Sequence, residues 1–437
     1  MELMIDTEIV ALILFVVIFA LILVGYPVAF TLAGLSILVG YFLVPDFLDL
    51  LPLRIMGTMK NYVLLAVPLF IFMGLMLEKS GLAENLLNTM AILFGKIKGG
   101  LAISVVIVGA LLAASTGIVG ATVVTMGLIS IPTMLKRNYK PELAAGAIVS
   151  SGTLGQIIPP SVVLVLLGSV LNVSVGDLFT AAVVPGLMLV VAYITYIAIY
   201  AHLYPESAPS IPASEIAKFK SEDFGKKVFE AFVLPTILIL SVLGSIFAGI
   251  ASPTEAAAVG ALGAILLTMT QGQFSMSKLS EVCKETTKLA SMVFMILLGA
   301  TTFALVFRGL GGDRYLVDLI EQSALSPMMF LLLVMVVVFI AGFFIDFIEI
   351  IFIIVPVVTP IFIAMNIDLI WIGILFALNL QTSFLTPPFG FALFYLKGVA
   401  PPELRTSMIY KGVIPFLLIQ IIVLILVVMF PGLVGVK

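Results

Sequence analysis

The sequence has few charged residues and almost none of the side chains that usually carry chemistry. Only 10% of its 437 residues are Asp, Glu, Lys or Arg, whereas a soluble chain of this length carries about a quarter. It has one cysteine, Cys283, and one histidine, His202, which exclude an internal disulfide framework and a Cys- or His-cluster metal site. No nucleophile–base pair and no nucleotide-binding motif is visible, so we expect neither an enzyme nor an ATP-driven protein.

Apolar side chains make up most of what is present. Hydrophobic residues are 62% of the chain, which predicts an all-α polytopic membrane protein. The net charge of −3 and the lack of a basic tract exclude nucleic acid as a partner. The acidic start, MELMIDTE, is a poor signal-peptide beginning and favours an external N-terminus.

An internal repeat organises the sequence. Landmarks recur 226 to 228 residues apart: Pro27 and Pro253, Thr180 and Thr406, Pro159-Pro160 and Pro387-Pro388, Pro132 and Pro360. We therefore expect a first repeat over 1–205, a polar linker over 206–227 and a second repeat over 228–437. Internal repeats in a membrane protein are typical of secondary transporters.

Each repeat is expected to hold about five spans and one re-entrant hairpin. The hairpins are predicted over 101–135 and 328–364, with arms of about 13 to 16 residues that are too short to cross a bilayer. A helix broken at midplane follows each hairpin, over 143–171 and 369–396.

The charges that flank the two hairpins predict that the repeats are inverted. Basic residues flank the first hairpin: Lys96, Lys98, Lys136, Arg137 and Lys140. Mainly acidic residues flank the second: Asp313, Arg314, Asp318, Glu321 and Asp368. The first hairpin is therefore expected to open from the cytoplasm and the second from outside, with the linker in the cytoplasm and both termini in the periplasm.

The double prolines predict sodium sites. Pro159-Pro160 remove two amide donors, so carbonyl groups near Gly155 and Ile158 lose their helical partners. Opposite them we place the first hairpin tip, with the hydroxyl groups of Ser115 and Thr116. Carbonyl and hydroxyl oxygens without a carboxylate suit Na⁺.

A matching sodium site is expected in the second repeat. It would use Ser383, Thr386 and the carbonyl groups before Pro388, and would face the second hairpin tip.

Polar residues near the breaks and the second tip are candidates for substrate binding. Helix N-termini at both breaks would attract a substrate carboxylate. The candidates are Thr153, Gln156, Asp346, Glu349, Gln381 and Thr382. Carboxylates within a membrane segment suggest function, although Asp346 and Glu349 could instead be solvated at the tip. Arg308 is expected to end a span at the outer surface or to contact a substrate carboxylate, and Glu255 to form a capping box with Ser252.

Five motifs together resemble the large membrane subunit of a tripartite ATP-independent periplasmic (TRAP) transporter of the C4-dicarboxylate or organic-acid type. They are GIASPTEAAAVGA (249–261), SGTLGQIIPPS (151–161), STGIVGATV (115–123), FFIDFIEIIFIIVPVVTP (343–360) and LQTSFLTPPFGFALFYLKGVAP (380–401). The resemblance covers nearly the whole chain.

The resemblance implies an elevator mechanism in the bacterial inner membrane. It implies Na⁺-coupled uptake of an organic acid from a periplasmic solute-binding protein, with a separate small four-helix membrane subunit as partner. It also implies sodium ligands at Ser115 or Thr116, Gly155, Ile158 and Pro160, and at Ser383, Thr386 and Pro388.

Other functions remain open at this point. A stand-alone Na⁺/dicarboxylate symporter of the related two-hairpin fold would transport without a binding protein, but its typical Ser-Asn-Thr tips are absent. An ion channel would need a continuous polar pore, whereas the polar residues here cluster at the helix breaks.

Overall fold

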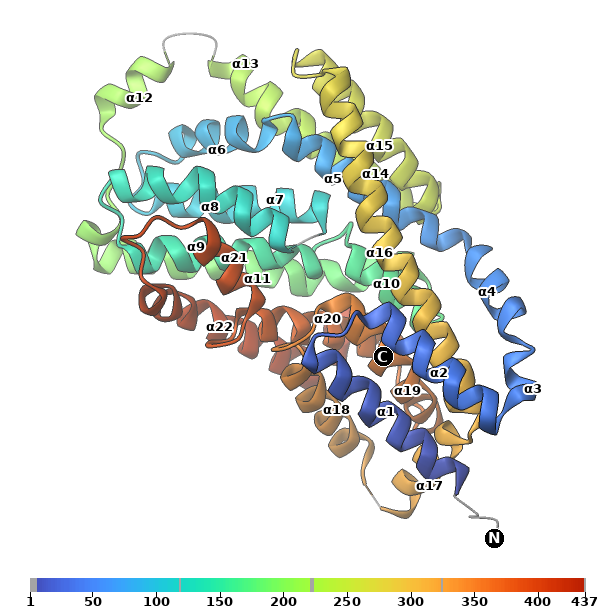
Figure 1. Ribbon diagram of the computed structural model, residues 1–437. Coiled ribbons are helices and arrows are strands. Elements are labelled where there is room, and N and C mark those ends of the chain that lie inside the picture. The colour runs from blue at the N-terminus through green and yellow to red at the C-terminus, as the bar shows by residue number, and fades with distance from the viewer. Residues whose placement is uncertain (1–5, 118, 221–223, 324, 436–437) are drawn as a thin grey trace.

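The protein is a bundle of helices (Figure 1). The structure, a computed structural model, describes residues 6–117, 119–220, 224–323 and 325–435, without the side chains of residues 114–116, 215 and 218–220. Every secondary-structure element in these ranges is a helix, and nine of the described helices are long and apolar enough to cross a membrane. This confirms the all-α polytopic class.

The first half of the chain contains eleven α-helices and two short 3₁₀ turns among its described residues. They are α1 (Thr7–Val24), α2 (Val28–Leu43), α3 (Pro45–Leu48), α4 (Leu51–Met59), η1 (Tyr62–Leu65), α5 (Ala66–Lys79), α6 (Leu82–Leu93), α7 (Gly100–Thr116), α8 (Val119–Lys136), α9 (Pro141–Thr153), η2 (Leu154–Gln156), α10 (Val162–Leu171) and α11 (Val175–Leu203). The expected linker region contains short helical pieces: η3 (Pro205–Ser207), α12 (Ala213–Lys220) and α13 (Phe224–Val228).

The second half follows the same order of elements. It contains the π-helical turn η4 (Phe229–Val233), α14 (Leu234–Phe247), α15 (Pro253–Thr270), α16 (Met276–Gly309), α17 (Gly312–Gln322), α18 (Pro327–Ala341), α19 (Phe347–Ala364), α20 (Leu369–Leu385), α21 (Phe391–Val399), α22 (Thr406–Met429) and η5 (Pro431–Val434). Helix α19 begins and ends 228 residues after α8 begins and ends.

The hairpin arms are longer than the sequence analysis expected. Helices α7 and α8 have 17 and 18 residues, and α18 and α19 have 15 and 18. An 18-residue helix is about 27 Å long. The expectation of arms as short as 13 residues was wrong because Pro132 and Pro360 lie inside α8 and α19 and do not end them.

Local capping explains where several helices begin. The capping box expected at α15 is confirmed: Glu255 accepts a hydrogen bond from the Ser252 amide at 2.8 Å, and the Ser252 hydroxyl accepts from the Glu255 amide. At the break before α10, the Ser161 side chain accepts from the Leu164 amide.

The helices form two groups (Figure 1). Helix α16 runs along one side with α2, α4, α14 and α15, where α2 packs against α16 and α15 packs against α5. Helices α7 to α9, α11, α20 and α22 lie together on the other side, and α9 packs against α22.

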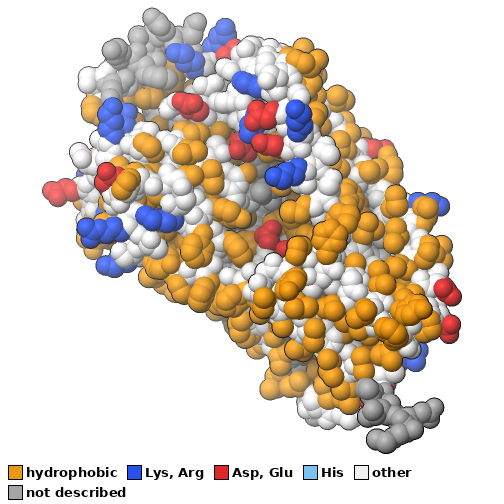
Figure 2. Space-filling view, viewed as in Figure 1, with side chains coloured by type: hydrophobic (Ala, Val, Ile, Leu, Met, Phe, Trp, Pro, Cys, Tyr) orange, Lys and Arg blue, Asp and Glu red, His pale blue; other side chains and the backbone are white. Residues whose placement is uncertain are grey.

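The surface is strongly apolar over much of the molecule. Figure 2 shows hydrophobic side chains across the lower and right parts of this face, while most charged side chains gather at the upper left. Large apolar side chains such as Phe42 and Ile250 are 72% and 82% exposed. A surface of this kind suits a lipid environment and confirms that the chain is a multi-pass membrane protein.

Candidate functional site

The first helix break leaves three carbonyl groups without hydrogen bonds. Pro159 and Pro160 have no N–H, so the carbonyl of Gly155 lacks the donor that an α-helix would place four residues later. No hydrogen bond between described residues reaches the carbonyl oxygens of Gly155, Ile158 or Pro160. The neighbouring Gln156 carbonyl is satisfied by the Ser161 hydroxyl at 2.9 Å. Free carbonyl oxygens in this apolar setting fit a hard monovalent cation.

The first hairpin tip lies against this break. A Cβ atom on Gly155 would sit 2.5 Å from the carbonyl oxygen of Ala113, near the end of α7. Gly117, in the left-handed conformation at φ 61°, approaches Val162 in the same way. The predicted ligand side chains of Ser115 and Thr116 lie outside the described side chains, although their backbone belongs to α7.

The base of the same hairpin is anchored by a buried phenol. The Tyr139 hydroxyl accepts a hydrogen bond from the Leu101 amide at 3.3 Å. Burial raises the pKa of Tyr139 to about 12, so the phenol remains neutral under physiological conditions.

The second break differs from the first in its hydrogen bonding. The carbonyl groups of Ser383 and Thr386 accept from the amides of Thr386 and Gly390 at 3.1 and 2.9 Å. The Pro388 carbonyl accepts from the Tyr410 hydroxyl at 3.2 Å. Each of these oxygens keeps a second lone pair, but the second break fits a cation less well than the first.

The second hairpin also lies against its break. A Cβ atom on Gly342, at the end of α18, would clash with the Ser383 hydroxyl. The Ser383 hydroxyl itself donates to the Leu380 carbonyl at 2.8 Å, and Thr382 donates to Leu378 at 2.7 Å. The described side chain of Thr382 is thus buried and already bonded.

Two predicted substrate residues meet in a buried polar cluster. Gln381 Nε2 lies 3.5 Å from Thr153 Oγ1, and Gln420 Nε2 lies 3.4 Å from the same oxygen. Gln420 also donates to the Tyr193 hydroxyl at 2.8 Å. Sequence reasoning missed Gln420 and Tyr193, although a glutamine inside the apolar run FLLIQIIVLI was a signal. Gln156 is fully buried and neither of its side-chain polar atoms has a partner among the described residues.

The two carboxylates at the second tip have a local structural role. Asp346 is the N-cap of α19 and accepts from the Phe347 amide at 2.8 Å. Glu349 reaches back to the Asp346 amide at 3.2 Å, which completes a capping box. Sequence reasoning recognised this pattern at Glu255 but missed it here.

A cavity of about 630 Å³ lies between α4 and α16 on one side and α10 and α19 on the other. Its polar lining residues are Arg54, Thr58, Asn61, Ser169, Thr301 and Arg308. None of the twelve predicted site residues with described side chains lines it. The expected sites are thus buried behind this cavity or lie elsewhere.

Two guanidinium groups give the cavity a positive character. Arg54 is exposed, and Arg308, whose side chain is 55% exposed, pairs loosely with Asp313 at 3.6 Å. Hydrogen bonds cross the cavity wall: Asn61 donates to Ser169 at 3.0 Å, which joins the start of η1 to α10. This arrangement can attract and bind an anion such as a carboxylate.

The fold is shared with solved transporters. The chain superposes on the YdaH transporter of Alcanivorax borkumensis with a TM-score of 0.64 and 14% identity, over 98% of both chains. It also superposes on MtrF of Neisseria gonorrhoeae, with a TM-score of 0.59 and 11% identity over 98% of this chain and 95% of that one. At these identities the similarity establishes the fold alone.

The family is decided by sequence. Residues 15–433 match the model of the tripartite ATP-independent periplasmic transporter, DctM component. The chain belongs to the DctM family. This DctM-family permease is 33% identical to the C4-dicarboxylate TRAP transporter large permease protein DctM of Pseudomonas aeruginosa, over 89% of each chain. The identity of the family confirms the resemblance drawn from the motifs.

Relatives of this permease are named for different substrates. It is 30% identical to the sialic acid TRAP transporter large permease protein SiaM of Vibrio cholerae, over 94% of both chains. It is also 30% identical to the ectoine TRAP transporter large permease protein TeaC of Halomonas elongata, over 94% of this chain and 95% of that one.

Proposed function

We propose that this permease carries out Na⁺-coupled uptake of a small organic acid across the bacterial inner membrane. It is the translocating subunit, takes its substrate from a periplasmic solute-binding protein and works beside a small four-helix membrane subunit. The observation that carries the proposal is the pairing of a positively charged cavity with a helix break whose carbonyl groups lack partners. Membership of the DctM family and the names of the relatives support it.

Sodium is proposed to bind at the first break. The carbonyl oxygens of Gly155, Ile158 and Pro160 supply neutral hard ligands, and Ser115 and Thr116 at the adjoining hairpin tip would complete the shell. A second ion is proposed at Ser383, Thr386 and Pro388, through the lone pairs that their hydrogen bonds leave free. The bound ions are transported cargo and not a resident cofactor.

The cavity is proposed to receive the substrate. Arg54 and Arg308 would bind carboxylate oxygens, with the hydroxyl groups of Thr58 and Thr301 beside them, 3.4 Å apart. The buried residues Thr153, Gln156, Gln381 and Thr382, and the tip residues Asp346 and Glu349, are proposed to contact substrate only after the hairpins have moved.

Inverted repeats are proposed to underlie this movement. The matching ends of α8 and α19 support them. So do two contacts between residues at the repeat distance: Thr153 with Gln381, 228 apart, and Tyr193 with Gln420, 227 apart. Equivalent residues meet each other where a two-fold axis passes between two repeats.

The repeats are proposed to form an elevator, in which the hairpins and broken helices slide as one unit against the supporting helices. The exchanged packing of α2 on α16 and α15 on α5 supports a continuous supporting layer. Both termini are proposed to lie in the periplasm.

Reconstitution in proteoliposomes tests the function. The permease, its small subunit and the binding protein loaded with a dicarboxylate should accumulate substrate when an inward Na⁺ gradient is imposed, and a K⁺ gradient should not replace it. Arg54→Gln or Arg308→Gln should raise the half-saturating substrate concentration about tenfold or more, because one charge-assisted contact is lost. Accumulation that ignores Na⁺ would falsify the coupling, and uptake without the binding protein would favour the stand-alone symporter.

A further inference from the structure

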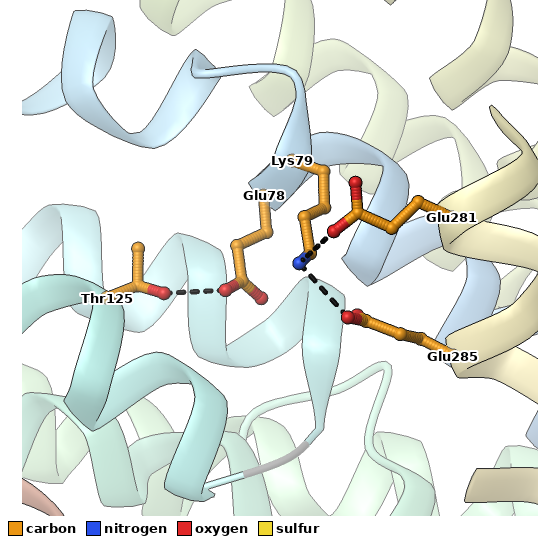
Figure 3. A network of polar contacts seen from close by, with 5 residues as sticks. All are labelled: Glu78, Lys79, Thr125, Glu281 and Glu285. Atoms are coloured by element: carbon orange, nitrogen blue, oxygen red, sulfur yellow. Dashed lines mark hydrogen bonds and ion pairs between the residues drawn. The ribbon is translucent and has the colours of Figure 1, made fainter. Parts of the chain in front are cut away.

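The two ends of α16 have different surroundings. At its C-terminal end the helix borders the cavity that contains Arg54 and Arg308. Near its N-terminal end, five polar residues from α5, α8 and α16 lie together (Figure 3). We call them the polar latch; they are Glu78, Lys79, Thr125, Glu281 and Glu285. One end of the supporting helix is thus open and the other is tied to its neighbours.

The latch links three helices in a chain of contacts. Lys79, the last residue of α5, donates to Glu281 at 2.8 Å and to Glu285 at 3.1 Å, both on α16. On the other side, the Thr125 hydroxyl on α8 donates to Glu78 Oε1 at 2.5 Å. The latch therefore connects α16 to α5, and α5 to an arm of the first hairpin.

Glu78 depends on the hairpin arm for its hydrogen bond. Its second carboxylate oxygen, Oε2, is buried and has no hydrogen-bond partner among the described residues. The ammonium group of Lys79 is already shared between two carboxylates. Thr125 is therefore the described hydrogen-bond donor to the Glu78 side chain, and separation of α8 from α5 would leave a partly buried carboxylate without it.

The packing of the two hairpins differs in the same sense. Helices α5 and α6 pack against α7 of the first hairpin, whereas α16 and α17 pack against α19 of the second. The positions that correspond to Glu78 and Lys79 in the second half are near Arg308, at the end of α16, where the cavity is open. Matched places in the two halves are thus closed in one case and open in the other.

We propose that the polar latch holds the permease in a state that is closed at the N-terminal end of α16 and open at the Arg54–Arg308 cavity. Substrate leaves at the latch end only after the Thr125–Glu78 hydrogen bond breaks and α8 moves away from α5. This inference rests on the proposed transport function, because it assigns the latch a step in the same cycle.

Cross-linking tests the latch. In a Cys283→Ser background, which removes the one native cysteine, Glu78→Cys and Thr125→Cys are bridged with a short, reducible bifunctional thiol reagent. Bridging should lower Na⁺-driven uptake at least tenfold, and a reductant should restore it. Uptake that continues at its unbridged rate would overturn the latch.

The matched control bridges two helices of the supporting layer. A Cβ atom at Gly260 on α15 lies close to the side chain of Met73 on α5, so Gly260→Cys with Met73→Cys receives the same reagent. This bridge should leave uptake unchanged, because α5 and α15 are expected to stay together through the cycle.

A measurement that needs no transport separates the two proposals. Thr125→Val should raise amide hydrogen exchange in the last turn of α5 and in α8 several-fold, while Thr125→Ser, which keeps the hydroxyl, should not. Equal exchange in the two variants would count against the latch. Loss of uptake in the unbridged protein together with the expected exchange pattern would count against the transport function alone.

Discussion

Gly155 lies where the first broken helix meets the first hairpin, and its missing side chain makes the contact possible. A Cβ atom there would press on the backbone oxygen of Ala113, which cannot rotate away as a side chain could. Gly155→Ala should therefore lower the free energy of unfolding by about 1–3 kcal/mol and weaken Na⁺ activation of uptake. Thermal unfolding in detergent and uptake at varied Na⁺ concentration measure both effects.

Gly34 is the matched control for this substitution. It lies inside α2, and a Cβ atom there has no neighbour within 4 Å. Gly34→Ala should leave uptake unchanged and stabilise the fold by up to about 1 kcal/mol. A loss of stability as large as that of Gly155→Ala would show that the close approach to Ala113 is not the cause.

The Tyr193–Gln420 hydrogen bond is also a residue-scale feature with a measurable energy. Gln420→Leu removes a donor to a fully buried phenol and should cost about 1–3 kcal/mol of stability. Tyr193→Phe combined with Gln420→Leu should cost less than the two single changes added together, by about 0.5–2 kcal/mol. Strict additivity in this double-mutant cycle would mean that the two side chains do not interact.

At the scale of the element, the capping box of α19 separates a structural role from a transport role. Asn is as good an N-cap as Asp, so Asp346→Asn should keep the stability of the hairpin, whereas Asp346→Ala should lose about 1 kcal/mol. If the carboxylate also contacts substrate, Asp346→Asn should reduce uptake although the melting temperature is kept. Normal uptake in Asp346→Asn would leave capping as its whole role.

At the scale of the whole molecule, the one cysteine offers a direct test of topology. Cys283 is exposed near the N-terminal end of α16. With this end in the cytoplasm, a membrane-impermeant maleimide should label inside-out vesicles and spare right-side-out vesicles. A single cysteine introduced at Asp6 in a Cys283→Ser background should show the reverse pattern. Labelling of both positions from one side would contradict the proposed inversion.

Much of the fold could be predicted because it depends on local chemistry. Apolar runs of span length indicate membrane helices wherever they are packed, and a proline lacks an N–H in any surroundings. The breaks at Pro159-Pro160 and Pro387-Pro388 and the cap at Ser252 were therefore visible in the sequence. The lengths of the hairpin arms were not, because helix–helix packing keeps α8 and α19 helical through their internal prolines.

The sequence by itself determined the membrane class, the family and the places where helices break, since each depends on composition or on neighbours in the chain. Only the tertiary structure decided which polar residues meet. Gln420 reaches Thr153, 267 residues away, and Lys79 reaches Glu281 across 202 residues. Arg54 and Arg308 line one cavity for the same reason. Such contacts depend on how helices pack in space, and no local pattern of side chains encodes that packing.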